Sequence, residues 1–243
     1  MSTKQLTSSE IASLWTGYMQ NTMTKCVMEY FLAKVEDPDI QSCIQQSYDL
    51  AESNIKVITE IYTQEGMQIP VGFSNQDVHL QASRLFSDTF FLMYIHHMGK
   101  IGLVQYSLLQ AMSVRRDIAT FFAQALKSTS DLHDQASELS LEKGLLIRPP
   151  YIPEPKSVEF VQNRSYFSGN SIFSDKRPLN AIEISHLFSN LQTNLLGMML
   201  SVGFAQTAKS KEVRDYMYRG AAVAKKHMKI FANHLIESEV QAP

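Results

Sequence analysis

Residues 6–15 read LTSSEIASLW and residues 179–188 read LNAIEISHLF, and these two stretches decide how the chain is organised. Shifting the sequence by 173 positions aligns residues 6–70 with residues 179–243 without a gap. Self-similarity at a fixed offset indicates a duplicated unit. The sequence therefore predicts one complete unit, residues 6–175, followed by the first half of a second copy. The identical pairs include Leu6/Leu179, Glu10/Glu183, Ile11/Ile184, Leu14/Leu187, Asn21/Asn194, Phe31/Phe204, Ala51/Ala224 and Pro70/Pro243.

The complete unit has the pattern of four helices, because apolar residues recur at steps of three and four. The predicted helices cover residues 8–35, 38–64, 82–112 and 114–143. The first and third joints are short and the second, residues 67–81, is long, which is the connectivity of ferritin-like bundles. We therefore predict an all-α fold: a ferritin-like four-helix bundle with one long crossover, followed by a half repeat. The half repeat is predicted to be a helical hairpin of residues 181–208 and 211–239.

Each predicted helix carries a seam that should face the bundle core. The seam of the second helix reads Ile40, Ile44, Ser47, Ala51, Asn54, Ile58, Ile61, and that of the fourth reads Ile118, Phe122, Ala125, Thr129, Leu132, Ala136, Leu139. In the third helix we expect Met93, His97, Ile101 and Val104. Gly66 and Gly144 are placed to end the second and fourth helices in the left-handed conformation.

The predicted domains are residues 1–147, the bundle, and residues 179–243, the first two helices of the second repeat. Between them, residues 148–178 are rich in proline and aromatic residues, and RPPYIPEP must be extended chain. We expect this linker to pack its large side chains against a helical unit, since a purely flexible tether would have fewer of them. They are Tyr151, Phe160, Tyr166, Phe167 and Phe173.

Composition excludes several classes of protein. A formal net charge of −2 gives no reason to expect affinity for nucleic acid, and no apolar run is long enough to span a membrane. The first ten residues lack the features of a secretory signal, so we expect a cytoplasmic protein. Cys26 and Cys43 would lie at unequal distances from the turn near Asp37, which makes a disulfide between them unexpected.

Four stretches together resemble a family of bacilli, the domain of unknown function 3231. They are the LxxxEIxxL opening, RPPYIP after the fourth helix, the phenylalanine-containing linker and KRPLNAIEISHLF at the second start. The resemblance covers essentially the whole chain and implies a ferritin-like bundle in each of two repeats, with distant kinship to spore coat proteins of the coat-F type. It implies no chemistry. The chain departs from the two-repeat pattern by stopping halfway through the second repeat.

The sequence does not supply a di-iron centre of the ferritin-like kind. Such a centre needs a Glu-x-x-His motif from each of two helices, and no Glu-x-x-His occurs in the chain. We therefore expect no cofactor, and leave open whether a metal binds. No nucleophile elbow, phosphate-binding loop or Cys-x-x-Cys motif occurs either, so an enzymatic role is disfavoured.

Three polar residues fall on predicted seams at similar heights, counted from the turns: Asn21, Asn54 and His97. Buried polar groups must be paired, so these residues could bond to one another, fix the bundle register or line a small cavity. The alternative is that the histidine is a core residue with its own hydrogen bonds.

Charge differs between the two copies. Residues 209–229 are rich in lysine and arginine, whereas the matching stretch of the first copy carries Glu36, Asp37, Asp39, Asp49 and Glu52. These are either two solvated helix faces or surfaces that dock electrostatically, unit against unit or chain against chain.

The half repeat raises the question of what covers its apolar seams. The hairpin could pack on the first unit, pair with its twin from another chain, or continue in nature into further helices. We favour a homodimer through residues 179–243, since a symmetric pair restores four helices. For the whole chain we favour a non-enzymatic, structural or interaction role, associated with spores by family analogy. The alternative is a ferritin-like module that binds a metal or small ligand inside the bundle.

Overall fold

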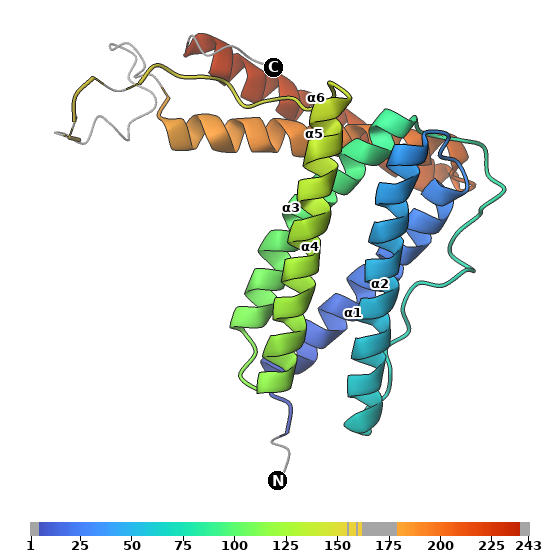
Figure 1. The fold of residues 1–243 in the computed structure, drawn as a ribbon. Helices are drawn as coiled ribbons and strands as arrows, with labels where there is room; N and C mark the ends of the chain where they lie inside the picture. The colour runs from blue at the N-terminus through green and yellow to red at the C-terminus, as the bar shows by residue number, and fades with distance from the viewer. Residues whose placement is uncertain (1–4, 155, 159, 162–178, 239–243) are drawn as a thin grey trace. The chain divides into compact units, whose positions relative to one another are not determined.

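The chain forms two compact units, Met1–Leu146 and Ile147–Pro243. The computed structural model describes residues 5–154, 156–158, 160–161 and 179–238. Figure 1 shows the helices of these residues, and no strand occurs among them. The all-α prediction is therefore confirmed. The helices are α1 (Ser8–Leu32), α2 (Pro38–Gln64), α3 (Asp88–Ala111), α4 (Arg116–Glu142), α5 (Ala181–Thr207) and α6 (Lys211–Glu237).

The first unit is a four-helix bundle with one long crossover. Short joints connect α1 to α2 and α3 to α4, while residues 65–87 run back along the bundle from the end of α2 to the start of α3 (Figure 1). The predicted connectivity is thus confirmed. In the second unit, α5 and α6 form a helical hairpin, as the half repeat predicts.

The ends of the helices follow from local sequence, and the first helix of each copy begins with the same N-terminal cap. At α1, the Thr7 side chain accepts from the Glu10 amide while Glu10 reaches back to the Thr7 backbone. Asn180 and Glu183, 173 residues later, form the same capping box at α5. Gly66 and Gly144 follow α2 and α4 with φ of 66° and 67°, in the left-handed region that favours glycine.

The start of α3 differs from the prediction. The helix begins at Asp88, six residues after the expected Ala82, because the Ser87 side chain caps the Phe90 amide. The residues before it are held out of the helix by Tyr30, whose hydroxyl donates to the Ser83 carbonyl and accepts from the Leu85 amide. Local helical pattern in residues 82–87 is therefore overridden by tertiary contacts of the crossover.

The crossover is fastened along one stripe of α1, made of residues spaced four apart: Tyr18, Thr22, Cys26 and Tyr30. The Phe73 amide donates to Thr22 Oγ1 at 3.2 Å, and Cys26 Sγ donates to the Ser74 carbonyl at 3.3 Å. A Cβ atom at Gly72 would lie 2.7 Å from Thr22 Oγ1, so only glycine lets the chain approach this closely. The stripe therefore binds extended backbone through hydroxyl and thiol groups.

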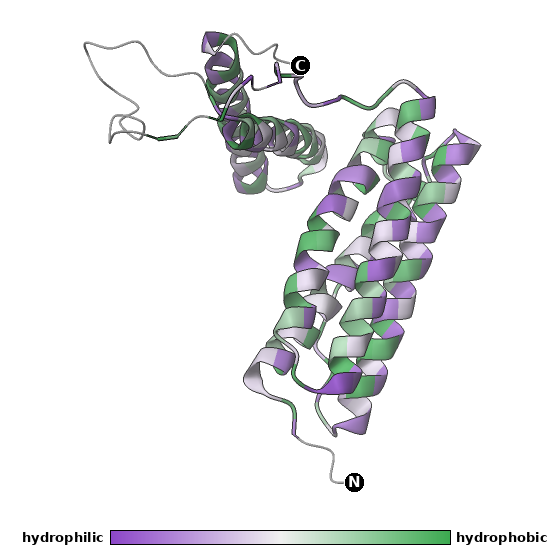
Figure 2. Cartoon of the chain, turned by 60° about the vertical axis from the view of Figure 1, so that its left-hand side comes forward, coloured by the Kyte–Doolittle hydropathy of each residue, from purple (hydrophilic) through white to green (hydrophobic). Residues whose placement is uncertain are grey.

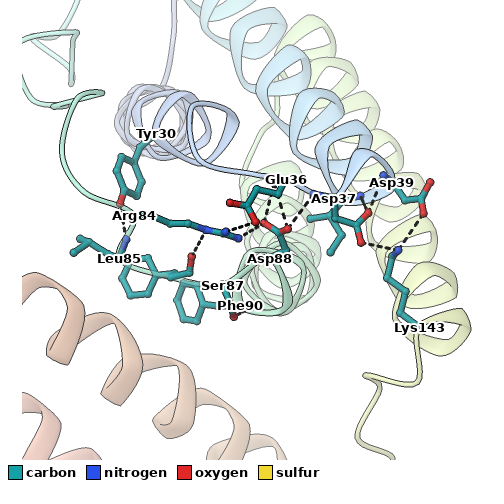
Figure 3. A network of polar contacts seen from close by, with 12 residues as sticks. Tyr30, Glu36, Asp37, Asp39, Arg84, Leu85, Ser87, Asp88, Phe90 and Lys143 are labelled. Carbon is teal, nitrogen blue, oxygen red and sulfur yellow. Dashed lines mark hydrogen bonds and ion pairs between the residues drawn. The ribbon is translucent and has the colours of Figure 1, made fainter.

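A network of charged side chains ties the α1–α2 turn to the other two helices (Figure 3). Asp88 accepts from the Glu36 and Asp37 amides at the turn and from the Arg84 guanidinium. On the other side, Lys143 at the end of α4 bonds to Asp37 and Asp39. Because three helices and the crossover contribute, this network fixes one end of the bundle.

The predicted seam is confirmed for α2 and, except at Leu139, for α4, whereas that of α3 is confirmed at His97 and wrong at Ile101 and Val104. All seven α2 seam residues are buried, as are six of the seven in α4. In α3, however, Ile101 and Val104 are exposed, and the core is reached instead through residues such as Phe91 and Tyr106. Figure 2 shows how hydrophobic residues are distributed along each helix.

The linker side chains that the structure describes do not pack as predicted. Tyr151 and Phe160 are 82% and 80% exposed. The other three, Tyr166, Phe167 and Phe173, lie outside the described residues.

Both cysteines are buried free thiols, so the expectation of no disulfide is confirmed. None of the helices in the described part of the chain combines the length and hydropathy that crossing a membrane requires.

Candidate functional site

A cluster of three polar side chains lies inside the first unit. Asn54 Nδ2 donates to Asn21 Oδ1 at 3.1 Å. The Tyr106 hydroxyl oxygen accepts from Asn21 Nδ2 at 2.9 Å and from Asn54 Nδ2 at 3.2 Å, and the hydroxyl lies 3.2 Å from Asn21 Oδ1. All three side chains are buried. Burial raises the pKa of Tyr106, against the opposing effect of the two amides, so the phenol stays protonated at neutral pH.

The structure brings Asn21 and Asn54 together and places His97 elsewhere. Tyr106, which bonds to both amides, lies nine residues beyond His97 in α3, roughly 13 Å along the helix axis. The matched heights predicted for His97 assumed a helix that begins at Ala82, and the later start at Asp88 moves every α3 residue along the bundle. Burial, followed by the charge of Lys100, lowers the pKa of His97 to about 4, so it is a neutral core residue.

The two asparagines have counterparts at the same positions of the second unit. Asn21 corresponds to Asn194 and Asn54 corresponds to His227. His227 Nδ1 lies 3.3 Å from Asn194 Oδ1, so the polar pair between the first two helices is present in both copies. Here the pair is more open to solvent than in the first unit, where Tyr106 closes it. Applying the 173-residue offset to Asn54 could have revealed this pair from the sequence.

A cavity of about 160 Å³ adjoins the cluster in the first unit. All four helices contribute to its wall. The buried part includes Ser47 and Ala51 of α2 and Thr129 and Leu132 of α4. Met23 of α1 and Ile101 of α3 also line it and are exposed, which places the mouth between these two helices.

The residues that the structure describes hold no group of three or more His, Cys, Asp or Glu arranged to bind a metal ion. Two histidines, His96 and His133, form a stacked pair with ring centroids 4.7 Å apart. His133 Nδ1 lies 3.1 Å from the His96 carbonyl oxygen, and burial followed by the charge of His133 lowers the pKa of His96 to about 4. This pair packs α3 against α4.

Most of the acidic residues that could dock the basic stretch are already paired inside the first unit. Glu52 bonds to Lys25, Glu36 to Arg84, and Asp37 and Asp39 share Lys143. Electrostatic docking of α6 on this acidic face would have to displace those pairs.

Comparison with known proteins shows the family. The chain belongs to the family described as a protein of unknown function, DUF3231, which matches residues 1–158 and 167–243. A relative, the uncharacterised protein YvdQ of Bacillus subtilis strain 168, is 24% identical over 145 residues, which cover 58% of this chain and 85% of YvdQ.

A solved structure supports the helical fold. A candidate spore coat protein of Bacillus halodurans C-125 superposes with a TM-score of 0.57 at 22% identity. The match covers 62% of this chain and 98% of that protein. At this identity the likeness establishes the helical fold.

Proposed function

We propose that this chain is a non-enzymatic building block that joins a second copy of itself through α5 and α6, and that it serves in a spore-associated assembly. The observation that supports the pairing is the apolar seam of α6, which consists of Val213, Met217, Ala224 and Phe231 and of which only Ala224 is buried. The family and the fold shared with a candidate spore coat protein support the association with spores.

The exposure of this seam is clear when each residue of α6 is compared with its counterpart in α2. Ile40 of α2 is 2% exposed, whereas its counterpart Val213 of α6 is 47% exposed. Ile44 is fully buried, and its counterpart Met217 is only partly so. Burying one large apolar side chain contributes about 1.5–3 kcal/mol, so a partner that covers several of them gains substantial free energy.

The polar pair supports a helical partner at the same seam. In the first unit, the Asn21–Asn54 pair is completed by a hydroxyl from a third helix. The Asn194–His227 pair has the same position between its two helices and presents amide and imidazole groups toward the place of such a helix. In a two-fold dimer each pair would meet its symmetry mate and form one polar layer.

The stripe that holds the crossover in the first unit has changed its chemistry in the second. Tyr18, Thr22 and Cys26 correspond to Leu191, Leu195 and Met199. Leucine has no polar side-chain atom and the thioether of methionine is only a weak hydrogen-bond acceptor, but both pack well against another helix. This substitution favours a helical neighbour for α5.

The pairing is tested by light scattering on the full chain, two variants and a chain ending at Asp175. Met217→Glu places a charge on the seam, while the control Lys226→Glu places it at the counterpart of the exposed Ser53. We expect the full chain and the control to have twice the mass of one 27.5 kDa chain, and the other two to be monomeric. If the full chain is as monomeric as the short one at high micromolar concentration, the pairing does not occur.

The association with spores is tested by immunodetection in coat extracts of purified spores and in vegetative cells. A signal confined to vegetative cells contradicts the spore association.

We also infer a cytoplasmic site of synthesis and action, which the two buried thiols support, because free cysteines persist where the medium is reducing. The short–long–short connectivity further supports a bundle of the ferritin-like type.

A further inference from the structure

We propose that the cavity of the first unit binds a small neutral molecule with an apolar body and one hydroxyl group. The inference concerns α1 to α4 alone and does not depend on pairing through α5 and α6. It rests on three properties of the cavity wall: its lack of charge, its size and two buried aliphatic hydroxyl groups, those of Ser47 and Thr129.

The cavity wall selects against ions. Its lining consists of apolar side chains, amides, hydroxyls and two tyrosines, with no acidic or basic residue among the described residues that form it. An ion taken from water into such a place would be uncompensated, which costs far more than burial of a neutral group. The phenols do not supply a charge either, since burial raises the pKa of Tyr94 to about 12 and also raises that of Tyr106.

The size suits a ring or a short chain. The volume of about 160 Å³ is close to that of engineered apolar cavities, about 150 Å³, that hold benzene. The apolar part of the lining includes the flexible methionines Met28 and Met98, which adapt to the shape of a ligand.

Two buried hydroxyl groups provide the polar recognition. Ser47 and Thr129 are 8% and 5% exposed, and neither side chain has a hydrogen-bond partner within the described part of the chain. Ser13 Oγ is the one fully enclosed side-chain oxygen without a partner among the described residues, so the hydroxyls of Ser47 and Thr129 keep accessible surface. Both residues line the cavity, and that surface therefore faces it.

The position of Thr129 is fixed by its neighbour. A Cβ atom at Gly102 would lie 2.9 Å from Thr129 Cγ2, so the methyl group of Thr129 occupies the space that this glycine leaves. Because the methyl group of Thr129 packs against α3, the χ1 angle of this β-branched side chain is restricted, and its hydroxyl group has a fixed position relative to the cavity. A hydroxyl of the ligand can donate to one of the two protein hydroxyls and accept from the other.

The test uses the full chain labelled with ¹³C at the methionine methyl groups, with phenol and toluene as probes. We expect phenol to shift Met28 and Met98 in a saturable way, with a dissociation constant on the order of 1 mM, while Met198 and Met199 of the second unit stay unchanged. Toluene, which lacks the hydroxyl, should bind at least about fivefold more weakly.

The double variant Ser47→Ala/Thr129→Val should weaken the binding of phenol by a similar factor and leave the binding of toluene unchanged. Its control, Ser53→Ala/Thr120→Val, removes the same hydroxyls from exposed positions of the same helices. The proposal is overturned if neither probe shifts Met28 and Met98, which would mean a cavity filled by water alone. It is also overturned if toluene binds as tightly as phenol in the unmodified chain, or if the double variant keeps the full affinity for phenol.

Discussion

At the scale of single residues, the sequence identifies two polar core positions, Asn21 of α1 and Asn54 of α2, and misses a third, Tyr106 of α3. Asn21 and Asn54 stand on seams whose polar residues are plainly out of place, and the structure pairs them. Tyr106 completes the pair but stands in α3, where apolar residues occur on every side, so no pattern marks it. The prediction of His97 in its place is wrong because the height of every α3 residue depends on where the helix begins, and contacts with Tyr30 set that start.

The hydroxyl of Tyr106 should contribute measurably to stability. Tyr106→Phe removes one of the two acceptors of each buried amide group, since Asn21 also donates to the Gly17 carbonyl and Asn54 to Asn21, so we expect the free energy of unfolding to fall by about 1–3 kcal/mol. Chemical denaturation measures this. The matched control is Tyr62→Phe, since Tyr62 is buried in α2 and has no hydrogen bond from its hydroxyl within the described residues. Equal losses for both variants would show that the hydrogen bonds of Tyr106 add nothing.

At the scale of elements, the clarity of a prediction follows the amphipathicity of the helix. The seams of α2 and α4 could be read because polar residues cover their outer faces. The third helix is apolar around most of its circumference, so several seams fit its sequence equally well, and the predicted seam is partly exposed. The start of α3 could not be predicted either, because residues 82–87 contain no breaker and only the crossover contacts hold them extended.

Glu10 connects two elements, and its charge should make stability depend on pH. It caps α1 and accepts from the Val114 and Arg115 amides at the start of α4, at 3.0 and 2.6 Å. Burial alone would raise the pKa of Glu10, but hydrogen bonds from Thr7, Arg115 and Val114 outweigh it and hold the pKa below the ordinary value of 4.5. The stabilisation is therefore present above pH 4.5 and is lost as the pH falls through the lowered pKa.

We expect Glu10→Gln to lower the free energy of unfolding by about 2 kcal/mol at pH 7, the usual worth of hydrogen bonds to a charged group. The difference from the unmodified chain should shrink as the pH falls toward 3. Denaturation curves across this range measure it, with Glu60→Gln on the exposed face of α2 as the control. A difference that stays constant with pH would assign the effect to packing instead of charge.

At the scale of the whole molecule, the two units contain the same pair of helices in different surroundings. In the first, α1 and α2 are covered by α3, α4 and the crossover; in the second, the corresponding seam is open. The duplication itself, and with it this imbalance, was predictable from one offset. A partner for the second seam was not predictable, because binding leaves no periodic trace in the chain.

Thermal unfolding should therefore separate the two units. We expect the transition of the first unit to be independent of protein concentration, and that of α5 and α6 to rise by a few degrees over a roughly fiftyfold increase, since association stabilises by mass action. Scanning calorimetry measures both, and the chain ending at Asp175 should show the first transition alone. A single transition that ignores concentration would contradict the expectation.

The stripe on α1 also means that the two thiols of the first unit respond to different motions. Cys26 lies beneath the crossover, bonded to Ser74, so lifting that loop is enough to uncover it. Cys43 is fully buried in α2 and becomes accessible only when helices separate. Burial raises the pKa of both thiols, that of Cys43 to about 11, which keeps them unreactive in the closed state. Local opening requires less free energy than global unfolding. We therefore expect the alkylation rate of Cys26 to report opening of the crossover, and the slower alkylation rate of Cys43 to report separation of the helices.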